Sequence, residues 1–166
     1  MELAKNPVTI ICIAAAVMFF AALALWCIHR TIKRHVTSVP LKMIDKMTGS
    51  EFEHYLAKLY TAKGFKVTHC GKSGDFGCDL VLKRGRRSTA VQAKRWNSHV
   101  SIGAVQQVFA AAAFYRTDDC LVITNNYFTP AARRLADAIG VKLVDREGLT
   151  KYIKDLKENN NDSKKI

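Results

Sequence analysis

The sequence is poor in acidic residues and has one long stretch with no charge at all. It contains 14 Asp and Glu against 26 Lys and Arg in 166 residues, a formal net charge of +12. No charged side chain occurs in residues 7–28, whereas residues 30–166 hold 25 bases and 13 acids. A chain of this length forms one modest domain rather than two. We therefore expect an apolar N-terminal segment followed by a single basic domain.

The cysteines lack the spacing of a disulfide or zinc framework. Two of the five lie in the apolar stretch, and the other three form an odd set without a CxxC pair: Cys70, Cys78 and Cys120. This usage is typical of buried, reduced thiols. The five histidines are also scattered, which argues against a His/Cys metal cluster.

The uncharged stretch is long enough to cross a membrane. Its 22 residues would extend roughly 33 Å as a helix, close to a hydrocarbon thickness of about 30 Å. A cleaved signal peptide requires a shorter apolar core and a small-x-small site, but bulky Trp26 stands near the end of this one. We predict an uncleaved transmembrane anchor over residues 1–29.

The charges that flank the stretch predict its orientation. Only Lys5 and the amino terminus precede it, whereas a basic connector over residues 30–47 follows, with Arg30, Lys33, Arg34, Lys42 and Lys46. Because positive charge remains on the cytoplasmic side of a membrane, we expect the C-terminal domain to face the cytoplasm.

Residues 48–157 alternate between helical and strand periodicity. Ser50 and Glu53 have capping-box spacing and predict the start of a helix over about 50–63. Three short β-rich runs follow, at residues 65–69, 78–83 and 88–95.

The second half of this domain alternates single helices with single strands. An alanine-rich helix is expected at 102–115, and Thr129 with Pro130 marks the start of another helix. Apolar strands are expected at 120–124 and 141–144, a last helix at about 146–157, and a disordered polar tail at 158–166. The order predicts a mixed sheet with an early hairpin and late crossovers.

The predicted hairpin brings three polar side chains together. If Gly85-Arg86 is a two-residue turn, Asp79 faces Gln92 across the hairpin. Lys94 shares their face because side chains alternate along a strand. An acid, an amide and an ammonium group then converge beside the glycine-rich loop 70–77. Polar groups between apolar flanks cost desolvation, which favours a chemical role over a chance cluster.

These residues resemble the Mrr-like branch of the PD-(D/E)xK nucleases. The matching motifs are Phe52-Glu53, the stretch from Gly74 to Asp79, Gln92-Ala93-Lys94 with Arg95-Trp96, and Thr124 with the stretch from Phe128 to Arg133. The resemblance covers about residues 48–150. It implies an α/β, restriction-endonuclease-like mixed β-sheet flanked by helices, preceded here by one transmembrane helix.

The resemblance also implies metal-dependent cleavage of DNA by Asp79, Gln92, Lys94 and Glu53. Asp79, Gln92 and Glu53 would supply oxygen ligands to Mg²⁺, with Mn²⁺ as a substitute and no small-molecule cofactor. Lys94 would orient water or stabilise developing negative charge. Gln92 stands where this pattern normally has an acid, and Cys78 replaces the usual proline before Asp79.

Several of these positions also have a purely structural interpretation. Glu53 completes a capping box with Ser50, and Asp75 follows Gly74 in a turn where Asp is favoured anyway. Either Gln106 or Gln107 on the alanine-rich helix is a candidate to face the site. For DNA binding we consider the basic residues around the site, chiefly Lys72, Arg84, Arg86, Arg87 and Arg95.

The leading hypothesis is a membrane-anchored DNA endonuclease at the cytoplasmic face of a bacterial inner membrane. Double-strand cleavage normally needs two active sites, which favours a homodimer. One alternative is a non-catalytic membrane tether that binds DNA through a nuclease-like fold. Another is a structural anchor for a membrane complex, which would have no affinity for nucleic acid at low salt.

Overall fold

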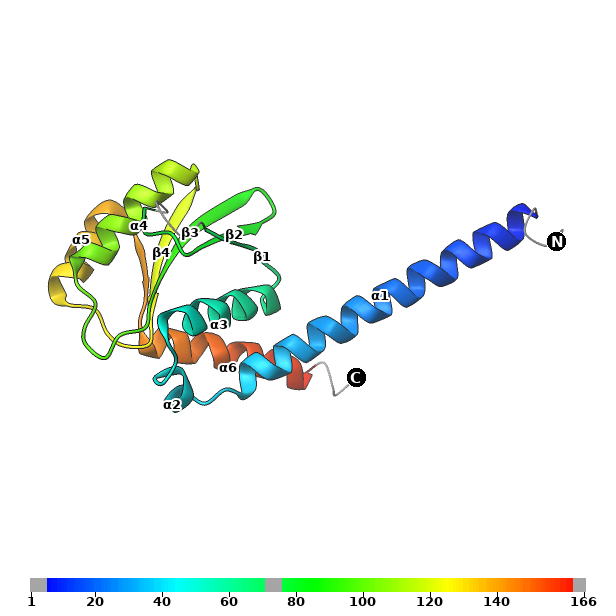
Figure 1. The fold of residues 1–166 in the computed structure, drawn as a ribbon, viewed down its shortest axis with the longest axis horizontal. Helices are drawn as coiled ribbons and strands as arrows, with labels where there is room; N and C mark the ends of the chain where they lie inside the picture. Colours follow the sequence, from blue (N-terminus) through cyan, green and yellow to red (C-terminus); the bar gives the residue numbers. More distant parts are fainter. Residues whose placement is uncertain (1–5, 71–75, 163–166) are drawn as a thin grey trace. The chain divides into compact units, whose positions relative to one another are not determined.

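The computed structural model describes residues 6–70 and 76–162 (Figure 1). The chain divides into two compact units, Met1–Ile32 and Lys33–Ile166. The first consists mainly of helix α1, which begins at Pro7 and continues into the second unit as far as Ser38.

Helix α1 is a candidate membrane span. It is long and apolar enough to cross a bilayer, and the large apolar side chains of residues 8–28 are exposed. The helix runs beyond the predicted end of the anchor, so the first part of the connector is helical. No proline or glycine interrupts it before Pro40, which cannot donate a backbone hydrogen bond.

The last turns of α1 belong to the second unit. The Val36 side chain is fully buried, and the Tyr55 hydroxyl donates to the Val36 carbonyl oxygen at 3.3 Å. A short helix α2, Leu41–Ile44, follows and buries Ile44. The connector is therefore part of the folded unit from Lys33 onward.

The second unit is built on a five-stranded mixed sheet. Its strands are β1 (Lys66–His69), β2 (Leu80–Arg84), β3 (Arg87–Lys94), β4 (Asp119–Thr124) and β5 (Lys142–Val144), which lie in that order across the sheet. The pairs from β1 to β3 are antiparallel, and those from β3 to β5 are parallel. This arrangement confirms the predicted early hairpin and late crossovers.

Helices cover both faces of the sheet (Figure 1). Helices α3 (Gly49–Ala62) and α6 (Arg146–Asp162) lie on one face, and α4 (Ile102–Tyr115) and α5 (Pro130–Ile139) on the other. On the α4 side, Val105, Val108 and Ala132 pack into one core cluster with Ala90 and Val122 of the sheet. Because strand side chains alternate, Gln92 and Lys94 share this face with Ala90.

Helix α3 begins differently from the prediction. The N-cap is Thr48, whose hydroxyl accepts from the Glu51 backbone nitrogen at 3.2 Å, while the Glu51 carboxylate accepts from the Thr48 backbone nitrogen at 2.7 Å. The predicted capping box of Ser50 and Glu53 is therefore wrong, because both residues already lie inside the helix. Glu53 is thus not explained by capping.

Two further helix ends can be compared with the sequence. Thr129 caps α5 as predicted, since its hydroxyl accepts from the Ala132 nitrogen at 3.2 Å with Pro130 in the first position. The predicted disorder from residue 158 onward is wrong for 158–162, which continue α6. Neither proline nor glycine stops that helix, and Lys154 and Glu158 form a pair one turn apart, at 3.7 Å. Residues 163–166 lie outside the described part.

Candidate active site

The β2–β3 hairpin has the predicted register. Arg84 pairs with Arg87 and Leu80 with Val91, and Gly85 takes the positive φ of +61° that the turn requires. The paired register ends at Leu80 and Val91, and the Asp79 nitrogen donates to the same Val91 carbonyl at 2.9 Å. The pairing of Asp79 with Gln92 therefore stays a prediction.

The Asp79 carboxylate is held against the neighbouring strand. This half-buried side chain accepts a hydrogen bond at its Oδ2 from the Ala93 backbone nitrogen, at 2.6 Å. A hydrogen bond to the ionised form favours a charged carboxylate. The contact thus fixes the position of the Asp79 carboxyl group at the end of the hairpin.

Gln92 is almost completely buried and has a partner at each end of its amide. Its side chain is 2% exposed. The amide nitrogen donates to the Ala104 carbonyl at 2.7 Å, and the amide oxygen then lies 3.1 Å from Nζ of Lys94. The Gln107 side-chain amide of α4 lies 2.9 Å from that of Gln92. Gln107 is therefore the member of the Gln106-Gln107 pair that reaches the site.

A small pocket lies between the end of β3 and the start of α4. Its volume is about 150 Å³, and Lys94, Trp96, Ser101 and Gln107 are among the residues that line it. A water molecule occupies about 30 Å³ in the liquid, so this pocket has room for a few waters or a similarly small polar group. Lys94 is therefore accessible to a small polar group.

Gly77 fits closely against the site. Its φ is +84°, and a Cβ atom there would lie 2.6 Å from Cβ of Gln107 and 3.0 Å from a terminal atom of the Gln92 amide. Any other residue would therefore be strained in backbone and would collide with both glutamines. This contact gives a physical reason for the last glycine of the glycine-rich loop.

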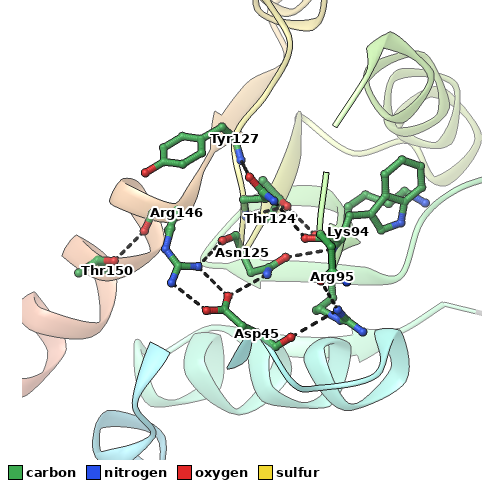
Figure 2. Close-up of polar contacts among 11 residues, drawn as sticks. Asp45, Lys94, Arg95, Thr124, Asn125, Tyr127, Arg146 and Thr150 are labelled. Carbon is green, nitrogen blue, oxygen red and sulfur yellow. Dashed lines mark hydrogen bonds and ion pairs between the residues drawn. The ribbon is translucent and has the colours of Figure 1, made fainter. Parts of the chain in front are cut away.

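The strand ends that carry the site are tied to the connector by an ion pair (Figure 2). The Arg146 guanidinium donates to both carboxylate oxygens of Asp45, at 2.6 and 2.8 Å. Asn125, at the end of β4, donates to the same carboxylate at 3.0 Å, and Arg146 donates to the Asn125 carbonyl at 2.8 Å. The hydrogen bond from Arg146 is the main reason why the pKa of Asp45 is lowered.

The same cluster fixes the backbone on both sides of Arg95 (Figure 2). The Thr124 hydroxyl donates to the Lys94 carbonyl at 2.6 Å, and the Trp96 nitrogen donates to the Asn125 side-chain oxygen at 3.0 Å. Lys94 and the pocket-lining Trp96 are thus anchored through β4. Sequence reasoning missed this role of Asp45, Asn125 and Arg146, because these residues are far apart in the chain.

Glu53 does not join the other predicted catalytic residues. It is half-buried on α3, which covers the opposite face of the sheet from Gln92. Within residues 6–70 and 76–162, no hydrogen bond or ion pair joins Glu53 to another side chain. The structure thus brings Asp79, Gln92, Lys94 and Gln107 together, and Glu53 remains a prediction.

The predicted DNA-binding residues that the structure describes lie in two places, the tip of the β2–β3 hairpin and the end of β3. Arg84, Arg86 and Arg87 lie at the hairpin tip, five residues and roughly 17 Å along the strand from Asp79. Arg87 pairs with Asp119 at 2.9 Å. Arg95 is half-buried, and its guanidinium donates to the Asn97 side chain at 2.9 Å and to the Asp45 carbonyl at 3.4 Å. Lys72 and Asp75 lie outside the described residues.

The oxygen donors at the site suit a hard divalent cation. Among the described residues, no three His, Cys, Asp or Glu side chains are grouped to hold a metal ion. Asp79 contributes a carboxylate and Gln92 an amide oxygen. Mg²⁺ commonly takes one or two carboxylates and completes its coordination with waters and substrate phosphates, so these two donors fit such an ion in kind.

Comparison with known proteins agrees with this fold. Residues 44–153 match the Mrr_cat family, described as restriction endonuclease. Because this match covers most of the chain, the chain belongs to the Mrr_cat restriction endonuclease family.

Among curated proteins, the chain is similar to the Type IV methyl-directed restriction enzyme EcoKMrr of Escherichia coli strain K12. The two are 37% identical over 129 residues, which cover 72% of this chain and 42% of that enzyme. The chain thus spans less than half the length of this relative. Among solved structures, a protein of unknown function called AF1548 is 18% identical with a TM-score of 0.49, covering 56% of this chain and 55% of the other.

The close packing of Gly77 can be tested against a second glycine with positive φ. Nothing lies within 4 Å of a Cβ atom built at Gly85. We expect Gly85→Ala to lower the free energy of unfolding by about 1 kcal/mol, and Gly77→Ala to lower it by about 1–3 kcal/mol more. Urea unfolding of the full chain in detergent micelles measures both, and equal losses would contradict the contact with Gln107.

Acid should weaken the fold through Asp45. Because its pKa is lower in the folded than in the unfolded chain, ionised Asp45 stabilises the fold above about pH 4, and this contribution is lost as the pH falls. We expect wild type to lose more free energy of unfolding between pH 7 and pH 3 than Asp45→Asn. Asp137→Asn, at an exposed position on α5, serves as the control. Identical pH slopes for wild type and Asp45→Asn would contradict this role.

Proposed function

We propose that this chain is a DNA endonuclease of restriction type that uses Mg²⁺, or Mn²⁺ in its place, and is held at a membrane by α1. The position of the Asp79 carboxylate against the Ala93 nitrogen, between Gln92 and Lys94 in β3, carries this proposal. Membership of the Mrr_cat family supports it. The EcoKMrr relative acts in a methyl-directed manner, so methylated DNA is the first substrate to test.

In this mechanism Asp79 and Gln92 hold the metal ion. When bound, such an ion supplies an activated water and neutralises charge on the phosphoryl oxygens. The Asp79 carboxylate is oriented by the Ala93 nitrogen, and the Gln92 oxygen is oriented by the bond from its amide nitrogen to Ala104. Both donors are therefore fixed before substrate arrives, which reduces the cost of ordering them.

Lys94 is the cation of the reaction centre. Its Nζ faces the Gln92 oxygen at 3.1 Å and lines the pocket beside α4. An ammonium group at this point stabilises negative charge that develops on a phosphoryl oxygen, or orients the attacking water. Glu53 is retained as a further carboxylate that would act from α3, through water.

The hairpin tip can bind the same DNA as the active site. A separation of roughly 17 Å corresponds to about five base pairs along a duplex. Arg84, Arg86 and Arg87 therefore suit phosphates several steps from the scissile bond, whereas Arg95 directly follows Lys94 in the sequence. Such contacts are independent of base sequence and weaken as salt rises.

The anchor would place this nuclease at the cytoplasmic face of a bacterial inner membrane. Helix α1 has no charge over residues 7–28 and is followed by basic residues, which favours retention of the domain in the cytoplasm. Cleavage of both DNA strands requires two reaction centres, so we propose that two copies act together.

A non-catalytic, membrane-tethered DNA-binding protein is the second candidate function. The observation that favours it is the neutral Gln92 where an acid is usual, which leaves Asp79 as the one carboxylate among the described residues that converge here. Such a protein would bind DNA in a salt-sensitive way without cutting it.

Cleavage separates the two candidates. We expect full-length protein in detergent micelles to nick or linearise supercoiled plasmid in Mg²⁺ or Mn²⁺ but not in EDTA. Asp79→Asn and Lys94→Met should each reduce the rate at least about 100-fold, because each removes a charge from the reaction centre. Agarose gels of methylated and unmethylated plasmid provide the measurement.

Matched variants control for general loss of charge. Asp137→Asn on α5 and Lys151→Met on α6 remove the same charges at exposed positions and should cut at the wild-type rate. If Asp79→Asn and Lys94→Met also cut at that rate, the proposed site is wrong. If no variant or wild-type sample cuts but DNA is retained at low salt, the tether is favoured.

Membrane attachment requires a separate measurement. We expect the full chain to remain in the membrane fraction after alkaline carbonate extraction, because removing about 22 apolar residues from lipid is prohibitively costly. Replacing Ala16 and Leu23 together with Arg should release it, whereas replacing both with Ile should not. Release of wild type by carbonate would contradict the anchor.

A further inference from the structure

Two cysteines lie in direct contact beside Asp79. The Sγ atoms of Cys70 and Cys78 are 2.8 Å apart, and both residues carry thiols rather than a disulfide. The Cys70 nitrogen also donates to the Asp79 carbonyl at 3.0 Å, which extends the β1–β2 ladder and holds Cys70 beside the Cys78–Asp79 backbone. The spacing of the cysteines in the sequence gives no sign of this pair.

The two sulfur atoms differ in access to solvent. Cys78 is 0% exposed and belongs to the core cluster under α4, whereas Cys70 is half-buried at the edge of that cluster. An oxidant dissolved in water therefore meets Cys70 first, and Cys78 is the neighbour that can react next.

We propose that Cys70 and Cys78 are an oxidation site, at which a peroxide converts the two thiols reversibly into an intrachain disulfide. The partner of the protein in this reaction is a small peroxide such as hydrogen peroxide. A transient, redox-sensing bond is the form in which disulfides usually occur in a reducing cytoplasm.

The reaction is balanced in two steps. The Cys70 sulfur attacks one oxygen of hydrogen peroxide, the O–O bond breaks, and Cys70 becomes a sulfenic acid while one water is released. The Cys78 sulfur then attacks the Cys70 sulfur, the S–O bond breaks, and a second water leaves with the Cys78 proton. A dithiol reductant reverses the result by two exchange steps and becomes a disulfide itself.

The bond would act on the reaction centre, and this part rests on the proposed function. Cys78 is covalently joined to Asp79, and Cys70 is hydrogen-bonded to it, so a new link between the two cysteines pulls on the backbone at Asp79. Displacement of a reacting group by about 1 Å can cost on the order of 100-fold in rate. We expect oxidation to slow cleavage by about tenfold.

Peptide mapping tests the bond itself. Full-length protein in micelles is treated with hydrogen peroxide, alkylated, and digested with trypsin, which cuts after Lys66, Lys72 and Lys83. The expected product joins two tryptic peptides, VTHCGK (67–72) and SGDFGCDLVLK (73–83), with the loss of two hydrogen atoms. Dithiothreitol should separate them again.

Two serine variants make the result specific. Cys70→Ser should leave Cys78 as an alkylatable thiol after the same treatment, and Cys120→Ser, at a buried position on β4, should still give the linked peptides. Overoxidation of Cys70 without a link, or links spread equally over all five cysteines, would overturn the proposal.

The effect on cleavage is measured on the same samples. Peroxide should slow the wild type, and reduction should restore the rate, while Cys70→Ser should respond to neither treatment. If the peptides are linked but the cleavage rate is unchanged, the proposed effect of the disulfide on Asp79 is wrong, whereas the oxidation site itself is confirmed. Absence of cleavage in every sample would count against the nuclease and leave the mass measurement valid.

Discussion

The ion pair between Asp45 and Arg146 is the interaction on which the arrangement of this domain depends. It joins the connector, the end of β4 through Asn125, and the start of α6 in one polar cluster. From there hydrogen bonds reach the backbone at Lys94 and Trp96. Arg146 and Asn125 donate hydrogen bonds to the Asp45 carboxylate, which offsets the cost of removing these charges from water. The cluster therefore holds the carboxyl ends of the central strands in one position.

On the face of β3 that α4 covers, the position of Gln92 depends on close packing rather than on charge. Gln92 is enclosed by Ala104, Gln107 and the backbone of Gly77, and each of these neighbours leaves little freedom of position. A buried amide with a partner at both ends holds one orientation, whereas a mobile one would not present its oxygen reliably. A strand with close-packed neighbours therefore holds the Gln92 side chain in one orientation.

Local rules predicted much of this domain from its sequence. The positive φ available to Gly85 determined the hairpin register from Arg84 and Arg87 to Leu80 and Val91, and Thr129 and Pro130 likewise fixed the start of α5. The start of α3 was mispredicted because Thr48-x-x-Glu51 and Ser50-x-x-Glu53 have the same spacing. Asp45, Asn125, Arg146 and the pairing of Cys70 with Cys78 could not be predicted, since they meet only after the sheet has assembled.

The burial of Val36 determines how the second unit can be separated from the candidate membrane span. The Tyr55 hydroxyl donates to the Val36 carbonyl, and the Val36 side chain is fully buried. A soluble fragment cut at the end of the helix would therefore begin with an exposed cavity and an unsatisfied hydroxyl. The boundary suited to protein production therefore lies within α1, near Lys33, so that the fragment keeps Val36.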